Sequence, residues 1–311
     1  MHRLRFVTAL GLVLGCDVGQ SAVQSANSAG ASGSTPAAAS AGAAASSGGA
    51  ASASGGASSG TGKAGAPPAP PQDEDFKLLF RDDFDSFDVS RWQLMTHSWA
   101  SNLALFSTQA AVVADGMLTI SLTPAPAGTV DDSNTTKPFL GAEVRSLDTL
   151  TYGRVRARAK LATGSAVVSS LVTIYTPWPA DNWNELDIEH LGAKPTDVQL
   201  NTMVYTGPPT TPPVATSVTP TPEPAVKALG FDANADFHVY TIEWTPSSAR
   251  FSVDETLLRE WTTHIDLMTL PQNVLMTIWA SNSVSWAGAV TEDTGKASAV
   301  YDWIELYQFK P

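Results

Sequence analysis

The sequence predicts an all-β protein, built as a sandwich or barrel of short strands. From about residue 76 onward, short stretches alternate apolar and polar residues and are separated by turn-forming residues. A period of two fits a strand with one buried face, and many such strands with turns between them are typical of sandwiches and barrels. No stretch has the spacing expected of a helix longer than a few turns.

The strands follow one another from residue 76, where an edge strand is expected to run into a turn. Asp115-Gly116 predicts a tight turn before an alternating stretch, and Thr245-Pro246-Ser247 predicts the turn of a hairpin. Residues 206–224 are rich in Thr and Pro, which predicts a long surface loop. The expected strands are 76–87, 117–122, 142–146, 153–161, 166–175, 183–192, 197–205, 237–244, 249–253, 273–280 and 300–307.

Four basic residues occupy every second position of the stretch 153–161: Arg154, Arg156, Arg158 and Lys160. Aliphatic residues alternate with them, so the basic side chains share one face of the strand. One charged face is typical of an antiparallel sheet whose outer side faces water. We therefore expect this row to be solvated.

Residues 1–16 are typical of a bacterial lipoprotein signal peptide. A basic start precedes a short apolar run, which ends in the lipobox-like segment Val13-Leu14-Gly15-Cys16. The run is too short for an ordinary transmembrane helix. A simple secretory signal is the alternative, but Cys16 is the only cysteine in the chain, which favours lipidation. We expect an exported protein, lipid-anchored to the bacterial membrane or cell surface, or released from it.

Residues 17–72 consist mostly of Ala, Gly and Ser and become Pro-rich towards their end. They hold almost no aromatic or β-branched residues, so ordering them would bury little apolar surface. We expect a disordered linker that tethers the following domain.

Residues 73–311 form the expected domain, and this domain is acidic. It holds 15 of the 18 basic and 29 of the 30 acidic residues, a net charge of −14. Proteins that bind the phosphate backbone present basic surfaces, so nucleic acid is not an expected partner. The domain also lacks a phosphate-binding glycine loop and a zinc-spaced His/Cys cluster. We expect a monomer.

Three carboxylates occupy alternate positions in one predicted strand: Glu185, Asp187 and Glu189, with Leu186 and Ile188 between them. Alternation places the three acids on one face. Like charges on one strand face repel, and Asp and Glu are poor strand formers, so the pattern requires a reason. Glu185 and Glu189 could lean towards the carboxyl separation of about 5–5.5 Å used by retaining glycosidases. A solvated strand face is the alternative.

Around this strand, several segments resemble glycoside hydrolase family 16, particularly the bacterial lichenases. The resemblance covers roughly residues 76–311. It rests on Glu185-Leu186-Asp187-Ile188-Glu189, Leu191-Gly192, 198–201, 229–232, 237–240 with Trp244, and 301–303. It implies a concanavalin-like β-jelly-roll sandwich of two antiparallel sheets with a concave substrate cleft. It also implies retaining endo-hydrolysis of β-glucan without a catalytic cofactor.

The resemblance also implies a role for individual residues. Glu185 matches the nucleophile, Glu189 the general acid/base and Asp187 the assisting carboxylate between them. Crowded carboxylates retain a proton, which separates their pKa values and suits these two roles. Positions that match substrate contacts are Trp183, Glu143, Arg145, Asn102, Trp99, Gln199, Asn201, Trp279 and Trp286. Core packing is an equally open interpretation for Trp279.

Several positions depart from the lichenase pattern. His190 stands where Phe is usual, Met203 replaces a tyrosine, Thr277 replaces an asparagine, and Glu255 occupies a turn position where Gly is preferred. Alternation turns His190 away from the acids, so we expect it in the core. Mixed-linkage β-1,3-1,4-glucan is the first expectation. A β-1,3-glucan, a xyloglucan and a bacterial exopolysaccharide remain open.

The resemblance further implies a structural calcium ion. Asp302 matches the side-chain ligand, with the carbonyl groups of Asp83 and Gly116 as candidate donors, and oxygen ligands suit calcium. Asp302 as an ordinary strand-end residue is the alternative. Two other functions also remain open: a transglycosylase on the same scaffold, and a non-catalytic carbohydrate-binding module.

Overall fold

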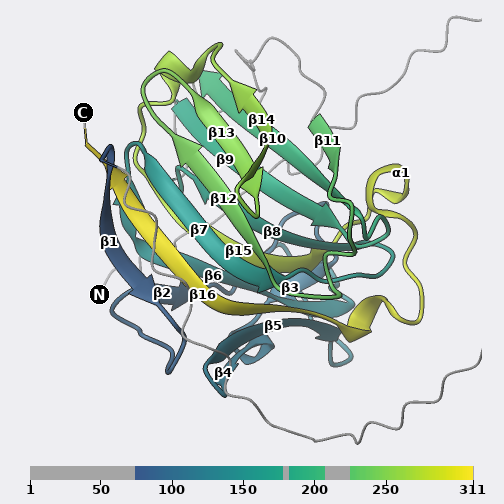
Figure 1. Ribbon diagram of the computed structural model, residues 1–311. Coiled ribbons are helices and arrows are strands. Elements are labelled where there is room, and N and C mark those ends of the chain that lie inside the picture. Colours follow the sequence, from purple (N-terminus) through teal and green to yellow (C-terminus); the bar gives the residue numbers. More distant parts are fainter. Residues whose placement is uncertain (1–73, 178–181, 207–224, 311) are drawn as a thin grey trace, which may run out of the picture. The chain divides into compact units, whose positions relative to one another are not determined.

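The computed structural model describes residues 74–177, 182–206 and 225–310 (Figure 1). The expected signal peptide, Cys16 and the linker lie outside the described residues, as does the loop 207–224. Within the described residues the chain forms two stacked layers of β-strands. No helix in this part is both long and apolar enough to cross a membrane.

The first sheet has the strand order β11-β10-β9-β8-β15-β6-β2. All of these pairs are antiparallel. The strand β9, which holds the three acids, is paired on both sides. The bounds are β2 Trp92–Leu94, β6 Phe139–Leu150, β8 Val167–Ile174, β9 Asn182–Leu191, β10 Asp197–Thr206, β11 Ala225–Ala228 and β15 Gln272–Ala280.

The second sheet has the order β4-β5-β16-β7-β12-β13-β14, and β1 also pairs with β16. The two sheets are joined where β5 pairs with the start of β6, and the short strand β3 runs parallel to β6. The bounds are β1 Phe76–Asp82, β3 Ala104–Phe106, β4 Ala111–Ala114, β5 Met117–Pro124, β7 Gly153–Lys160, β12 His238–Trp244, β13 Ala249–Val253, β14 Thr256–Trp261 and β16 Ala297–Phe309.

Helical structure in the described residues is limited to single turns. The α-helix α1 spans Val284–Ala287, and three 3-10 turns span Thr108–Ala110, Ile265–Leu267 and Thr294–Lys296. The prediction of an all-β domain without long helices is confirmed.

The hydrophobic core lies between the two sheets. Leu186 and Ile188 of β9 are fully buried there, as are Ile304 and Leu306 of β16 in the opposite sheet. Each such aliphatic side chain contributes roughly 1.5–3 kcal/mol when it leaves water. The apolar residues that alternate with the three acids therefore fix which face of β9 points away from the core.

Every predicted strand is present, with bounds close to those expected. The Asp115-Gly116 turn is confirmed, with both residues at positive φ between β4 and β5. Five strands were not predicted: β2, β3, β4, β11 and β14. The first four have only three or four residues, too few for alternation to be recognised. The edge strand β14 leaves both faces largely exposed, so its sequence does not alternate.

The prediction of a solvated basic row is wrong for Arg154 and Arg156, which are buried. Cross-strand register explains the difference. Arg154 lies opposite Glu243 of β12, and Arg156 lies opposite Glu305 of β16. Both arginines form ion pairs with these acids. The sequence of one strand does not show what the neighbouring strands place beside it.

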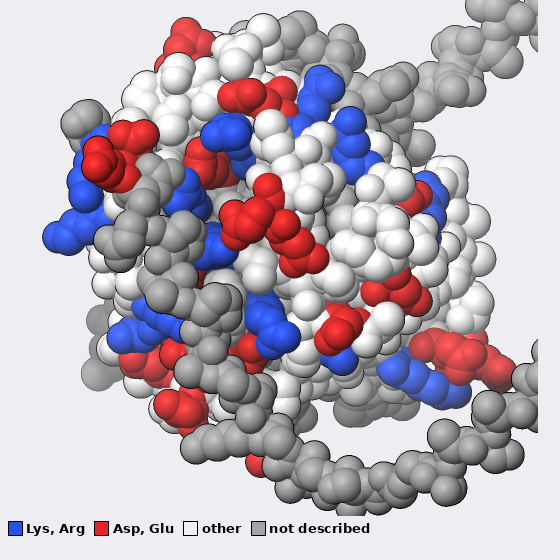
Figure 2. Space-filling view, viewed as in Figure 1, with Lys and Arg blue, Asp and Glu red and all other residues white. Residues whose placement is uncertain are grey.

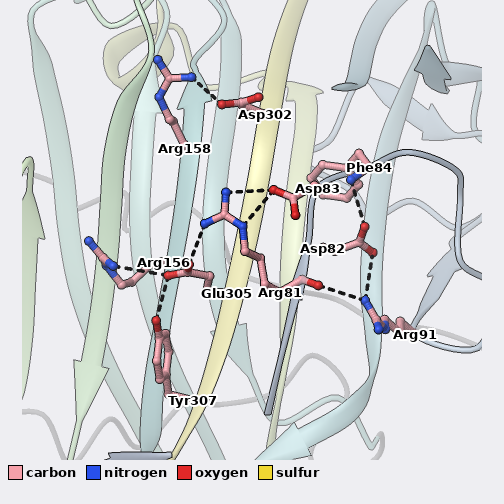
Figure 3. Close-up of polar contacts among 10 residues, drawn as sticks. All are labelled: Arg81, Asp82, Asp83, Phe84, Arg91, Arg156, Arg158, Asp302, Glu305 and Tyr307. Carbon is pink, nitrogen blue, oxygen red and sulfur yellow. Dashed lines mark hydrogen bonds and ion pairs between the residues drawn. The ribbon is translucent and has the colours of Figure 1, made fainter. Parts of the chain in front are cut away.

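Glu305 is the centre of this network on the outer face of the second sheet. Figure 3 shows Arg81 and Arg156 reaching its carboxylate from either side, at 2.7 and 3.3 Å. The Tyr307 hydroxyl donates to the same carboxylate at 2.9 Å. The face in Figure 2 accordingly shows acidic and basic groups interleaved, without a large basic patch on its described residues.

Candidate active site

The three acids lie on one face of β9, as alternation predicts. Glu185 and Asp187 are fully buried and Glu189 is 2% exposed. The strand runs between β8 and β10 with continuous pairing on both edges. Because both edges are hydrogen-bonded, the backbone that carries the acids is held rigidly.

A row of polar side chains crosses five strands at the level of Glu189. In register, Gln199 of β10 lies opposite Glu189, Glu189 opposite Ser170, Ser170 opposite Thr277, and Thr277 opposite Glu143 of β6. Directly paired residues share a face of the sheet, so all five point to the same side. This row brings Glu143 of β6 to the same face as Glu189 of β9, although the two residues are far apart in the sequence.

The other two acids have apolar neighbours on the same face. Val172 and Leu275 continue the row of Asp187, while Ile174 and Met203 flank Glu185. All four of these side chains are buried. For Asp187, this apolar surrounding disfavours the ionised form, although Asn201 lies opposite it in register.

Burial raises the pKa of Glu189 to about 7, and the hydrogen bond from Gln199 opposes this shift. Burial also raises the pKa of Asp187 well above its usual range, the charge of Glu189 adds to this, and a hydrogen bond with Glu185 opposes it. The cluster therefore retains protons near neutral pH. A carboxylic acid that is still protonated near pH 7 can act as a general acid.

Gln199 connects Glu189 to the one-turn helix α1. Its Nε2 donates to Glu189 Oε2 at 3.0 Å, and its Oε1 accepts from Trp286 Nε1 at 2.9 Å. Both ends of the amide are therefore engaged by protein groups. Glu189 Oε1 has no hydrogen-bond partner among the described residues.

Glu143 and Arg145, at the far side of the sheet, contact each other directly. Arg145 Nε donates to Glu143 Oε1 at 2.8 Å, and His97 Nε2 lies 3.5 Å from Glu143 Oε2. Burial lowers the pKa of His97, although the charge of Glu143 opposes this shift. The imidazole is therefore neutral near pH 7. The substrate contacts predicted for Glu143 and Arg145 stay predictions.

Three tryptophans predicted as sugar contacts form a continuous aromatic cluster. The ring centroids of Trp99 and Trp279 are 5.0 Å apart, and those of Trp279 and Trp286 are 5.8 Å apart. Trp279 is fully buried, as the core-packing alternative requires, whereas Trp286 is half-buried. The cluster therefore adjoins the Glu189 row on β15, since Trp279 follows Thr277 by two positions and shares its face.

Asn102 is held in one orientation by its neighbours. Its Oδ1 accepts from the Ala104 backbone N–H at 2.7 Å, which leaves the Nδ2 donor without a partner among the described residues. The same holds for three other buried donors: Trp99 Nε1, Trp279 Nε1 and Thr277 Oγ1. Leaving a buried donor unsatisfied costs about 1–3 kcal/mol.

The remaining predicted contacts also lie on β9 and β10. Asn201 lies opposite Asp187 in register and is 8% exposed. Trp183 is half-buried and shares the face of the acids, two positions before Glu185. Their contacts with substrate stay predictions.

His190 lies on the core side of β9, as expected. It is fully buried, and its Nδ1 lies 2.9 Å from the Asp197 carbonyl oxygen. Burial lowers its pKa, so the ring is neutral and takes no part in the acid cluster.

The three predicted calcium ligands lie on or beside neighbouring strands of the second sheet. Asp302 lies on β16 between its pairing with β5, which ends at Tyr301–Leu118, and its pairing with β1, which begins at Ile304–Asp82. Asp83 directly follows β1, and Gly116 directly precedes β5. However, the Asp302 carboxylate forms an ion pair with Arg158 (Figure 3). The described residues contain no group of three or more His, Cys, Asp or Glu able to hold a metal.

Two site residues were not predicted from the sequence. His97 lies in an irregular segment, where no periodicity assigns a face. Lys137 is 2% exposed and donates to the Trp99 and Asn102 carbonyl oxygens at 2.8 and 2.6 Å. A lysine just before a predicted strand carries no signal that it will be buried.

Comparison with known proteins finds β-glucanases among those with similar sequences and structures. Relatives include a β-glucanase of Paenibacillus polymyxa, 29% identical over 73% of this chain and 87% of its own length. A β-1,3-1,4-glucanase (lichenase) from a mouse hindgut metagenome has 27% identity and a TM-score of 0.61, covering 74% of this chain and 99% of that one. The Bacillus licheniformis β-glucanase gives 26% identity and a TM-score of 0.62, covering 74% and 98%.

These structures also confirm the predicted jelly-roll form of the sandwich. The model of the family described as "Glycosyl hydrolases family 16" matches residues 100–305, which include all three acids and the strands around them. The chain belongs to glycosyl hydrolase family 16.

Proposed function

We propose that the chain is a retaining endo-β-glucanase in which Glu185 is the nucleophile and Glu189 the general acid/base. The observation that carries this proposal is the placement of three carboxylates on one face of a doubly paired strand. Glu189, with a pKa raised to about 7, is suited to donate a proton. Family membership and the β-glucanase relatives support the reaction class.

The reaction proceeds in two displacements. Glu189 gives its proton to the leaving glycosidic oxygen while the bond from that oxygen to the anomeric carbon breaks and Glu185 bonds to that carbon. Glu189, now ionised, then takes a proton from water as the water oxygen displaces Glu185. Asp187, whose pKa is raised well above its usual range, keeps a proton in the cluster between the two steps.

Mixed-linkage β-1,3-1,4-glucan is the proposed substrate. A lichenase and two β-glucanases are among the similar proteins. Met203 and Thr277, which depart from the lichenase pattern, both lie in register with site residues: Met203 beside Glu185, Thr277 between Ser170 and Glu143. These two positions are where a preference for another β-glucan would arise.

A polysaccharide panel tests the proposal. The purified chain is incubated with barley β-glucan, laminarin, xyloglucan and bacterial exopolysaccharides, and the products are analysed for linkage. We expect oligosaccharides from barley β-glucan, and Glu185→Gln should abolish release while its circular dichroism spectrum stays native. Full activity of Glu185→Gln would refute the assignment of the nucleophile. Binding without turnover across the panel would instead indicate a carbohydrate-binding module.

Hydrolysis and transglycosylation pass through the same covalent glycosyl-enzyme intermediate. They differ in whether water or a sugar hydroxyl group then displaces Glu185. Adding an oligosaccharide acceptor distinguishes them. A hydrolase releases reducing ends at an unchanged rate, whereas a transglycosylase forms elongated products at the expense of hydrolysis.

Calcium at Asp302 belongs to this proposal as a structural ion. The adjacent strands support it, because β1, which ends before Asp83, and β5, which begins after Gly116, both pair with β16 next to Asp302. The ion pair with Arg158 opposes it, because a cation already neutralises the carboxylate.

Export and lipid anchoring at Cys16 are likewise proposed, on the sequence of residues 1–16 alone. Cys16→Ser should move the protein from the membrane fraction to the soluble fraction of a bacterial host. An unchanged distribution would leave a simple secretory signal as the better interpretation.

A further inference from the structure

Trp286 and Glu189 are linked through a single amide group. The indole N–H of Trp286 donates to Gln199 Oε1 at 2.9 Å, and Gln199 Nε2 donates to Glu189 Oε2 at 3.0 Å. The three residues come from three different elements, α1, β10 and β9. Gln199 is 7% exposed and Glu189 is 2% exposed, so this chain of hydrogen bonds is largely shielded from water.

The indole determines which way round the amide lies. A glutamine side chain presents an acceptor at one end and a donor at the other, and the two ends are similar in size. An indole N–H can only donate. If the amide of Gln199 turned over, two donors would face each other at Trp286. The Trp286 N–H therefore selects the orientation in which the NH₂ group faces Glu189.

This orientation has a consequence for the proton on Glu189. Oε2 accepts the hydrogen bond from Gln199, whereas Oε1 has no partner among the described residues. A protonated carboxyl group that accepts at Oε2 carries its proton on Oε1. The transferable proton is thus placed on the oxygen atom that has no hydrogen-bond partner among the described residues.

We propose that Trp286 is a positioning residue for acid/base catalysis, which acts through Gln199 to keep a donor on Glu189 Oε2 and the transferable proton on Oε1. This inference rests on the proposed function of Glu189. The donor stabilises Glu189 after its proton has passed to the leaving oxygen, and it remains in place until water returns a proton.

Other charged groups around Glu189 do not supply this contact. On its own strand it faces Asp187 and, beyond that, Glu185. From β10, β8 and β15 it faces the neutral residues Gln199, Ser170 and Thr277. Glu143, with Arg145 and His97, lies at the far end of the same row. Gln199 is thus the only side chain that donates a hydrogen bond to Glu189 among the described residues.

The test is to remove the indole N–H while keeping an aromatic ring, in Trp286→Phe. Without the N–H, the Gln199 amide is free to turn over. Its oxygen then accepts a hydrogen bond from protonated Glu189, which stabilises that form and raises the pKa of Glu189. Loss of one hydrogen bond to a charged group corresponds to an upward pKa shift of about one unit. We expect the alkaline limb of the kcat/KM profile to move up by this amount in the full-length chain, with kcat reduced.

A second variant and a double variant separate positioning from sugar stacking. Gln199→Met removes the donor directly and should produce a similar shift. Adding Trp286→Phe to Gln199→Met should then change the limb no further, because Trp286 acts only through the amide. An unmoved limb in Trp286→Phe with a raised KM, or shifts that add in the double variant, would overturn the proposal.

Trp261→Phe is the matched control. It removes an indole N–H that has no described partner, on β14 in the other sheet. Its pH profile should equal that of the wild type.

A titration without substrate makes the result independent of turnover. The ¹³C carboxyl resonance of Glu189, assigned with Glu189→Gln, is followed against pH in the wild type and in Trp286→Phe. An upward shift in the variant supports the positioning role even if no polysaccharide is cleaved. Equal titration curves refute it even if the chain is an active glucanase.

Discussion

The ammonium group of Lys137 lies 2.6 Å from the Asn102 carbonyl oxygen and, at the same time, 2.8 Å from the Trp99 carbonyl oxygen. It also lies 3.2 Å from Asp131 Oδ2. A buried lysine thus joins the segment of two predicted sugar contacts to the loop before β6. This cation supplements the backbone hydrogen bonds from Asn102 to Trp99 and from Leu103 to Ala280, which also hold that segment.

Replacing Lys137 should weaken substrate binding more than chemistry. Lys137→Met removes the buried ammonium group from both carbonyl oxygens, which keep only the weaker contacts from the Asn102 N–H at 3.1 Å and the Ser98 hydroxyl at 3.4 Å, so the segment 99–102 is held less firmly. Misplacement by about 1 Å can lower efficiency on the order of 100-fold. We expect a rise in KM on β-glucan with a smaller fall in kcat. Lys296→Met, at an exposed lysine paired with Asp293, is the control and should leave both constants unchanged. Equal constants for Lys137→Met and the wild type would show that the segment holds its shape without the lysine.

The contribution of Glu189 to the stability of the domain should fall as the pH rises from about 4.5 to about 7. Burial raises the pKa of Glu189 from 4.5 to about 7 in the folded state. In this window the unfolded chain releases a proton that the folded chain retains, so the free energy of unfolding decreases with pH. The decrease is on the order of 3 kcal/mol for this group, and Asp187, whose pKa is also raised, adds to it.

Urea denaturation at a series of pH values measures this slope. Glu189→Gln cannot titrate, so its stability should vary less between these pH values than that of the wild type. The same pH dependence in the wild type and in Glu189→Gln would contradict the raised pKa.

Removing Glu305 should destabilise the fold without touching the acid cluster. The carboxylate is fully buried and pairs with Arg81 and Arg156, which also pair with Asp83 and Glu255. Taking one partner from a buried ion pair typically costs about 3–5 kcal/mol, and these second partners make the loss smaller. We expect Glu305→Gln to lower the melting temperature, while Asp293→Asn at an exposed pair should not. Equal melting temperatures would mean that water replaces the carboxylate.

Calcium and Arg158 should compete for Asp302. In Arg158→Leu the carboxylate loses its cationic partner, so added calcium should raise the melting temperature more than in the wild type. Asp302→Asn should abolish the response in both backgrounds. If calcium and a chelator change neither melting temperature, the arginine alone serves as counter-ion and the calcium proposal is wrong.

The sequence alone was enough to identify the acid-bearing strand, because alternation assigns Glu185, Asp187 and Glu189 to one face and Leu186 to the other. Alternation likewise placed His190 in the core. It could not assign neighbours across the sheet. The prediction for Arg154 and Arg156 was wrong because Glu243 and Glu305 come from strands more than 80 residues away. Lys137 and His97 lie in irregular segments, where burial depends on the tertiary structure and not on a local period.

Gln199 illustrates the same limit within the site. Position along the chain indicated a residue near the acids, and the register confirms that it lies opposite Glu189. Its hydrogen bond to Trp286 joins residues 87 positions apart. Only the folded structure shows that both ends of its amide are used.

The pairing of β9 on both edges also disfavours folding in a wrong register. A slip of one residue against β8 and β10 would turn all three carboxylates into the core and expose Leu186 and Ile188. Burying several charges among aliphatic side chains is strongly unfavourable. A misregistered molecule would thus be inactive and also unstable, so it would unfold rather than accumulate. The residues that give the strand its chemistry thereby exclude native-like but inactive isomers of the sheet.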